Sequence, residues 1–350
     1  MPILTSPAVS VRPGRARFGY ESWQAAMKDA VRNPAELCRL LELPKEFALR
    51  TEAACSDFPL FAPRGYVARM VPGDPEDPLL RQVLPVEAEM HDSPGFVTDP
   101  VGDAAAALSP GLLQKYPGRV LLVTTGACAI HCRYCFRRHF PYQQTPHTLS
   151  SWQPALTAIA ADRSIHEVIL SGGDPLTLVD ESLAALADHL ANIPHVRRLR
   201  VHSRLPVVIP ERVTTELIEW LTGTRLVPVM VIHANHAQEL AGEAVTAIET
   251  LVDAGIPVLN QAVLLAGVND SLEAQLALSE RLVDLRVMPY YLHQLDRVSG
   301  AAHFEVPAHQ GEIIVKQLQE RLPGYAVPKF VMEIPGAKSK VTCEMAQQDE

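Results

Sequence analysis

The chain has 350 residues, of which 31 are Lys or Arg and 40 are Asp or Glu, giving a formal net charge of -9. A negative charge disfavours nucleic acid and anionic membranes as partners, so small-molecule chemistry is the better expectation. No apolar run approaches the ~18 to 20 residues of a membrane helix, and residues 1–20 lack the apolar core of a signal peptide. We therefore expect no membrane association and a cytoplasmic location.

The first third of the chain predicts a helical extension followed by an irregular linker. Residues 21–54 have helical spacing of apolar residues, with Ser22 placed to cap one helix and Pro34 to open a second. Residues 56–118 are rich in proline and glycine, which disfavour regular elements. We expect three parts: an extension and linker over 1–114, a core over 115–327 and a C-terminal segment over 328–350.

From residue 119 onward, apolar strand-like runs alternate with amphipathic helical segments. The runs are RVLLVTT, HEVILS, RRLRVHS, VPVMVIH, PVLNQAVLL and RVMPYYL, and PKFVMEI follows near the C-terminus. Most of them begin roughly 30 residues apart, as parallel strands joined by crossover helices require. This pattern predicts an α/β fold with a partial (βα)6 barrel, in which chemistry gathers at the C-terminal ends of the strands.

Three of the six cysteines, Cys128, Cys132 and Cys135, lie in one short segment directly after the first strand-like run. Three thiolates on one loop can bind three irons of a [4Fe-4S] cluster and leave the fourth iron open for an outside ligand. The alternatives are a redox disulfide, or a zinc site completed by His131 or His139. Cys38 and Cys55 are expected to be buried small residues.

The C-x3-C-x2-C spacing, with Tyr134 before the third cysteine, resembles the signature of the radical S-adenosylmethionine superfamily. This resemblance implies that S-adenosylmethionine binds the open iron and that Tyr134 lies near its adenine. A Gly-Gly-Asp turn after the second strand fits the same site, because glycines let the backbone approach a ligand closely. The carboxylate of Asp174 can accept a hydrogen bond from the ammonium group of S-adenosylmethionine. The residues expected around this cofactor are Tyr134, Ser171, Gly172, Gly173, Asp174, Ser203, Arg204, His233 and Gln261.

From about Asp77 to Lys340 the sequence also resembles the lysine 2,3-aminomutase family, through DPEDPLLRQVLP, YPGRVLLVTTGACAIHCRYCFRRHF, SGGDPL, NQAVLLAGVND and GYAVPKFVMEIPGAKSK. The resemblance implies that pyridoxal phosphate is bound covalently by Lys340, with Lys338 as the competing position. It also implies that Arg119 and Lys115 bind the cofactor phosphate. His233, Asn235, His236 and Gln261 match polar positions around the active site, although each could equally be a hydrogen-bonded core residue.

The same resemblance implies how a substrate would be held. Arg137 matches the arginine that pairs with the substrate carboxylate, and Asp296 and Glu333 match the acids that bind the far ammonium group of L-lysine. An arginine at one end and two acids at the other suit free lysine better than glutamate.

Two departures from the family pattern bear on the expected pathway. The second acid is an aspartate in well-known members, whereas this chain has Glu333. Clostridial-type members have a cysteine-rich tail that binds zinc, whereas only Cys343 follows Lys340 here, so we expect no structural zinc. The ending resembles the bacterial branch that supplies (R)-β-lysine for modification of elongation factor P, which would be an indirect partner.

The expected activity is therefore conversion of L-lysine to (R)-β-lysine, with a [4Fe-4S] cluster, S-adenosylmethionine and pyridoxal phosphate as cofactors. The family also implies an external one-electron donor of the flavodoxin or ferredoxin kind, and it leaves assembly into a homo-oligomer open. The rival hypotheses are an aminomutase of glutamate or arginine, and a non-catalytic zinc or iron-sulfur protein that would not bind pyridoxal phosphate.

Overall fold

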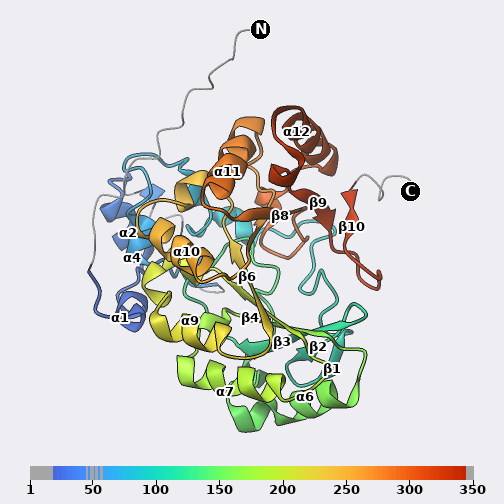
Figure 1. Cartoon of the computed structure of the whole chain (residues 1–350). Helices are drawn as coiled ribbons and strands as arrows, with labels where there is room; N and C mark the ends of the chain where they lie inside the picture. The colour runs from blue at the N-terminus through green and yellow to red at the C-terminus, as the bar shows by residue number, and fades with distance from the viewer. Residues whose placement is uncertain (1–18, 45, 48–50, 52–53, 56–57, 344–350) are drawn as a thin grey trace.

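A computed structural model describes residues 19–44, 46–47, 51, 54–55 and 58–343 (Figure 1). Short helices make up much of the described part of the N-terminal extension, and the predicted helix caps are confirmed. Ser22 accepts a hydrogen bond from Ala25 N at 3.2 Å, and Pro34 occupies the first turn of the second helix. The elements are α1 (Trp23–Lys28), α2 (Pro34–Leu40), α4 (Arg64–Val67), α5 (Pro78–Arg81) and the short 3-10 helix η1 (Glu87–Met90).

One twisted sheet forms the centre of the molecule, and its strands follow one another in chain order. All six predicted core strands are present, and the C-terminal run adds a seventh parallel strand. The parallel strands are β3 (Arg119–Thr125), β4 (Glu167–Gly172), β5 (Arg198–Ser203), β6 (Val227–His233), β7 (Val258–Val263), β8 (Met288–His293) and β9 (Lys329–Met332).

Antiparallel strands flank the parallel sheet at both edges, and the sequence did not predict them. At one edge, β1 (Ala107–Ser109) and β2 (Leu112–Leu113) pair with β3; at the other, β10 (Val341–Thr342) pairs with β9. The predicted boundary at residue 114/115 therefore separates β2 from the sheet to which it is hydrogen-bonded. Because β1 and β10 are not paired with each other, the barrel is open on one side, as a partial barrel requires.

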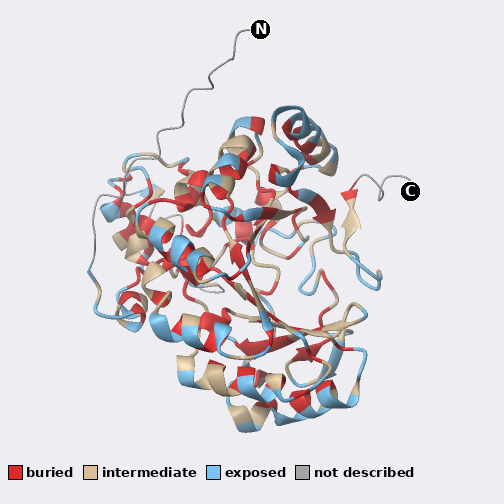
Figure 2. Ribbon diagram, viewed as in Figure 1, coloured by how far each residue is buried: buried red, intermediate tan, exposed pale blue. Residues whose placement is uncertain are grey.

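Helices cover the convex side of the sheet (Figure 1). They are α6 (Leu149–Ala161), α7 (Asp180–Ala191), α8 (Leu205–Val208), α9 (Thr215–Thr222), α10 (Glu243–Asp253), α11 (Leu272–Asp284) and α12 (Ala308–Arg321). Buried residues concentrate between these helices and the sheet, and exposed residues lie on the outer helix faces (Figure 2).

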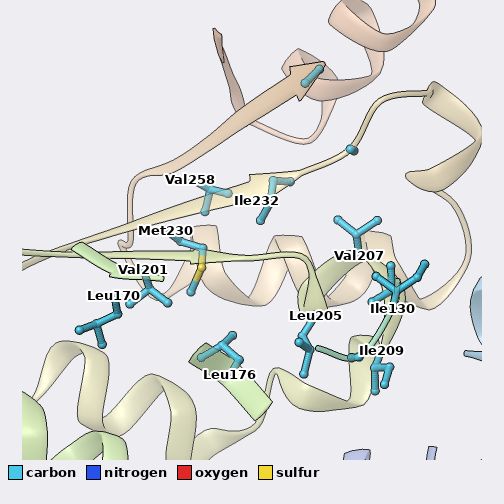
Figure 3. Close-up of a cluster of buried hydrophobic side chains, with 14 of the residues drawn as sticks. Ile130, Leu170, Leu176, Val201, Leu205, Val207, Ile209, Met230, Ile232 and Val258 are labelled. Carbon is cyan, nitrogen blue, oxygen red and sulfur yellow. The ribbon is translucent and has the colours of Figure 1, made fainter. Parts of the chain in front are cut away.

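Side chains that alternate along the strands give the sheet one apolar face and one polar face. Leu170, Val201, Met230 and Ile232 are buried in the main hydrophobic core, where Leu176 and Leu205 pack with them (Figure 3). Because side chains alternate along a strand, neighbours of these residues such as Ser171, His202 and His233 line the concave face. The concave face is therefore the polar one, and it holds the candidate site.

Candidate active site

A cavity of about 490 Å³ occupies the concave face of the sheet. Most of the residues predicted to bind the cluster, a cofactor or the substrate line this cavity, although they come from most of the strand ends. They are Lys115, Arg119, Cys128, Cys132, Tyr134, Cys135, Arg137, Ser171, Gly172, Gly173, Asp174, Ser203, Arg204, His233, Gln261, Asp296, Glu333 and Lys340. Lys338 and His139 are not among the lining residues, and neither are Asn235 and His236.

The three cysteines lie on the loop after β3, and Cys135 N donates to Cys132 O at 3.0 Å. Burial raises the pKa of the Cys128 thiol, and burial followed by the charge of Cys132 raises the pKa of Cys135 to about 11. These thiols need a metal to hold them as thiolates near neutral pH. The donor set therefore fits an iron-sulfur cluster that displaces the protons.

Each histidine that a zinc site would need has one ring nitrogen on a backbone carbonyl. The ring of His131 stacks on Phe58 and its Nδ1 lies 2.7 Å from Pro59 O, whereas His139 Nε2 lies 3.1 Å from Ser299 O. Within residues 19–343, apart from the gaps given above, no three His, Cys, Asp or Glu side chains converge on a single-ion position. The geometry favours a multi-iron cluster, which spreads its ligands, over mononuclear zinc.

The Gly-Gly-Asp turn after β4 packs against the cysteine loop. A side chain at Gly173 would overlap the Ala127 carbonyl, and Gly172 has a φ of +121°, which favours glycine. Gly173 N donates to Thr125 O and Asp174 N to Ala127 O, each at 2.8 Å. The glycines admit the backbone of the cysteine loop and so fix its position, and both also line the cavity, so their expected approach to a ligand stays a prediction.

Asp174 is buried and joins the ends of β4 and β5. Its carboxylate accepts from Ser203 Oγ at 2.8 Å and from Arg204 N at 2.7 Å. Burial raises the pKa of Asp174 to about 6, and these hydrogen bonds oppose that rise. The side chain therefore organises the strand ends, and it also lines the cavity.

Lys340 and Glu333 face each other in the hairpin between β9 and β10. Met332 pairs with Val341 in the antiparallel ladder, so Glu333 and Lys340 lie opposite each other just beyond this pair. Lys340 Nζ is 2.6 Å from Glu333 Oε2. Burial alone would raise the pKa of Glu333, but the Lys340 ammonium, through its charge and its hydrogen bond, lowers it below the usual value. The hairpin thus holds a lysine against an ionised carboxylate inside the cavity.

A chain of alternating charges runs from this hairpin to Arg137. Glu333 Oε1 is 3.6 Å from Lys115 Nζ, which is 2.8 Å from Asp103 Oδ1. The other oxygen of Asp103 accepts from Arg137 Nε at 2.6 Å. Sequence reasoning did not identify Asp103, because residues 103–107 read only as a small-residue stretch of the linker. In the structure, Asp103 orients the guanidinium of Arg137 and forms an ion pair with Lys115.

Two other predicted groups, Arg119 and Asp296, have no ion-pair partner among the described residues. The guanidinium of Arg119 lies over the Tyr116 ring at 4.8 Å, and no carboxylate in the described part of the chain is within ion-pair distance. Similarly, no hydrogen bond or ion pair to the Asp296 carboxylate is present among the described residues. Burial raises the pKa of Asp296 to about 7, and Lys340 opposes the rise. Arg119 and Asp296 are therefore free to bind opposite charges from a ligand.

Comparison with known proteins assigns the chain to a family. The model of the radical SAM superfamily matches residues 122–276. The L-lysine 2,3-aminomutase of Escherichia coli K12 is 45% identical over 326 residues, covering 93% of this chain and 95% of that protein. The chain belongs to the L-lysine 2,3-aminomutase family. The Haemophilus influenzae member is 44% identical over 91% of this chain and 95% of its own length, and the Clostridium subterminale member is 35% identical over 92% and 77%.

Membership confirms the predicted isomerase family, and it implies a [4Fe-4S] cluster, S-adenosylmethionine and pyridoxal phosphate as cofactors. Among solved structures, Streptococcus suis SuiB bound to S-adenosylmethionine matches 63% of this chain and 51% of its own length, with a TM-score of 0.48 and 12% identity. In the part of the chain that the structure describes, no helix is long and apolar enough to cross a membrane.

Proposed function

We propose that this aminomutase converts L-lysine to (R)-β-lysine by moving the amino group from C2 to C3. The observation that carries the proposal is the distribution of charge in one cavity. Arg137, the two acids Asp296 and Glu333, Lys340 and the cysteine loop all line this one cavity. Free lysine has the complementary pattern, with a carboxylate at one end and an ammonium group at the other.

The cluster would be held by Cys128, Cys132 and Cys135. The adjacent wall supplies groups for S-adenosylmethionine, with the buried ring of Tyr134 as an apolar face for its adenine. Tyr134 OH also lies 2.8 Å from His233 Nε2, so the aromatic ring is fixed in orientation before a ligand binds. Together the bound cofactors supply the radical chemistry, and these residues orient the reacting groups and exclude water.

Lys340 would bind pyridoxal phosphate, because it is the lysine of the C-terminal hairpin that reaches the cavity. Arg119, and Lys115 beside it, would bind the phosphate. Glu333 forms an ion pair with the Lys340 ammonium group. When Lys340 is bound to the cofactor, Glu333 would instead bind the ammonium group of the substrate. On this proposal Glu333 serves two partners in turn, whereas Asp296 serves only the substrate.

The substrate carboxylate would bind the Nη atoms of Arg137, since Nε is held by Asp103 and the guanidinium packs against Phe136 at 4.8 Å. Nη1 also donates to Ser171 Oγ at 3.4 Å, so Nη2 is the atom that keeps its donors for the substrate. A glutamate substrate would place a second carboxylate beside Asp296 and Glu333, which is unfavourable. The Asp296→Asn/Glu333→Gln double variant should lose turnover of lysine while retaining iron and bound pyridoxal phosphate. Unchanged lysine turnover would contradict the assignment of the acidic end.

We extend the proposal to the pathway that the sequence suggested. The higher identity and nearly full-length match to the Escherichia coli protein, compared with the clostridial one, support placement in the branch that supplies β-lysine for elongation factor P. A flavodoxin- or ferredoxin-like electron donor and a cytoplasmic location accompany this placement. Loss of β-lysyl modification of elongation factor P after deletion of the gene, read by intact-protein mass spectrometry, is the expected result; unchanged modification would contradict it.

A further inference from the structure

The guanidinium of Arg204 lies in the cavity wall against a predicted ligand of the cluster. Arg204 directly follows β5 and is 5% exposed. Its Nη1 donates to Cys132 Sγ at 2.7 Å and to Tyr134 OH at 2.9 Å. Sequence reasoning placed Arg204 among the groups around S-adenosylmethionine, and in the structure its guanidinium also donates to the cysteine sulfur.

A buried carboxylate fixes this arrangement from behind. Arg204 Nη2 donates to Glu239 Oε2 at 2.8 Å and to Gln82 Oε1 at 2.7 Å. Burial alone would raise the pKa of Glu239, but Arg204, through its charge and its hydrogen bond, lowers it. The pair is therefore ionised.

Glu239 cannot easily turn away from Arg204. Its other oxygen accepts from Asn235 N at 2.8 Å and from His236 N at 3.1 Å, both in the loop after β6. Gln82 Nε2, from the N-terminal extension, donates to the same oxygen at 3.1 Å. The carboxylate is thus held by backbone on one side and by the extension on another, so the guanidinium edge remains directed at Cys132.

A fixed cation and an N–H donor at a cysteine sulfur favour the reduced state of an iron-sulfur cluster. Reduction adds one electron to the cluster, and the added negative charge is stabilised by hydrogen bonds to the sulfurs and by nearby positive charge. The effect is large where water is excluded, because buried charges interact more strongly there.

We propose that Arg204, held in place by Glu239, sets the reduction potential of the cluster by donating to Cys132, so that one electron from an external donor is accepted more readily. This inference rests on the proposed cluster site at Cys128, Cys132 and Cys135. It assigns Arg204 a role toward the cluster itself, and it makes Glu239 a positioning residue that touches neither cluster nor substrate.

The test is the midpoint potential of the iron-sulfide-reconstituted full chain, measured by EPR at defined potentials without S-adenosylmethionine, pyridoxal phosphate or lysine. Arg204→Gln should disfavour reduction at least tenfold, a shift of about 59 mV to more negative potential for a one-electron couple. Glu239→Gln and Arg204→Lys should shift it in the same direction by less. Tyr66→Phe is the matched control, because Tyr66 OH accepts from Arg204 Nη2 at 3.3 Å but contributes no charge and does not touch the sulfur; its potential should equal that of the wild type.

Iron and sulfide analysis defines which variants are fully loaded. If Arg204→Gln or Arg204→Lys assembles a full cluster and keeps the wild-type potential, the proposal is wrong. It is also wrong if Tyr66→Phe shifts the potential as much as Arg204→Gln does. Because lysine is absent from the measurement, this result is independent of whether the proposed substrate is right. A wild-type protein that turns over lysine while the variants keep their potential would leave the function standing and remove the role of Arg204.

Discussion

The raised pKa of Asp296 predicts that lysine binding weakens as pH falls below neutrality. Asp296 is free of side-chain partners among the described residues, and burial raises its pKa to about 7. Only the ionised form attracts the substrate ammonium group. With a pKa of about 7, roughly a tenth of the molecules carry ionised Asp296 at pH 6 and about nine tenths at pH 8. The KM for L-lysine should therefore be about tenfold higher at pH 6 than at pH 8.

The assay is steady-state formation of β-lysine under anaerobic conditions at both pH values, with inhibition by L-norleucine as the internal control. Norleucine has the carboxylate and amino group of an amino acid but no side-chain ammonium, so its inhibition constant should change little with pH. Asp296→Asn should have a higher KM that no longer depends on pH in this range. An equal KM at pH 6 and pH 8 in the wild type, or an unchanged pH dependence in Asp296→Asn, would refute the reasoning.

Three further predictions follow from the site. Borohydride reduction should attach pyridoxal phosphate to Lys340, in the wild type and equally in Lys338→Ala, as peptide mass spectrometry would show. If the attached cofactor is lost in Lys338→Ala, then Lys338 is the lysine that binds it. Arg137→Lys should raise the KM for lysine by about tenfold or more, since an ammonium group cannot replace the guanidinium fork, and a KM within a factor of two of wild type would remove the carboxylate-binding role. Gly173→Ala should lower cluster content measured by iron analysis, because its side chain would overlap the Ala127 carbonyl, and full iron content would show that the turn can move.

The long strands and the cysteine loop could be predicted because their signals are local. RVLLVTT is a continuous apolar run and is observed as β3 over the same residues. The cysteine spacing defines a ligand set without tertiary information. Strands β1, β2 and β10 could not be predicted, because each has only two or three residues and each is stabilised by pairing with a neighbour rather than by its own sequence.

The two acids that orient cavity arginines, Asp103 and Glu239, could not be predicted for a different reason. Asp103 meets Arg137 across 34 positions of sequence, and Glu239 meets Arg204 across 35. Neither acid lies in a motif of its own. Most of the groups identified from the sequence line the cavity, whereas the partners that orient those groups became visible only when the strands were assembled.

The central claim is tested most directly by assaying iron-sulfide-reconstituted protein anaerobically with S-adenosylmethionine, pyridoxal phosphate, dithionite and L-lysine, and separating the lysine isomers by chiral chromatography. The account predicts (R)-β-lysine in the wild type and none in Cys132→Ala or Lys340→Ala. Absence of β-lysine from wild-type protein with a confirmed cluster and bound pyridoxal phosphate would contradict it.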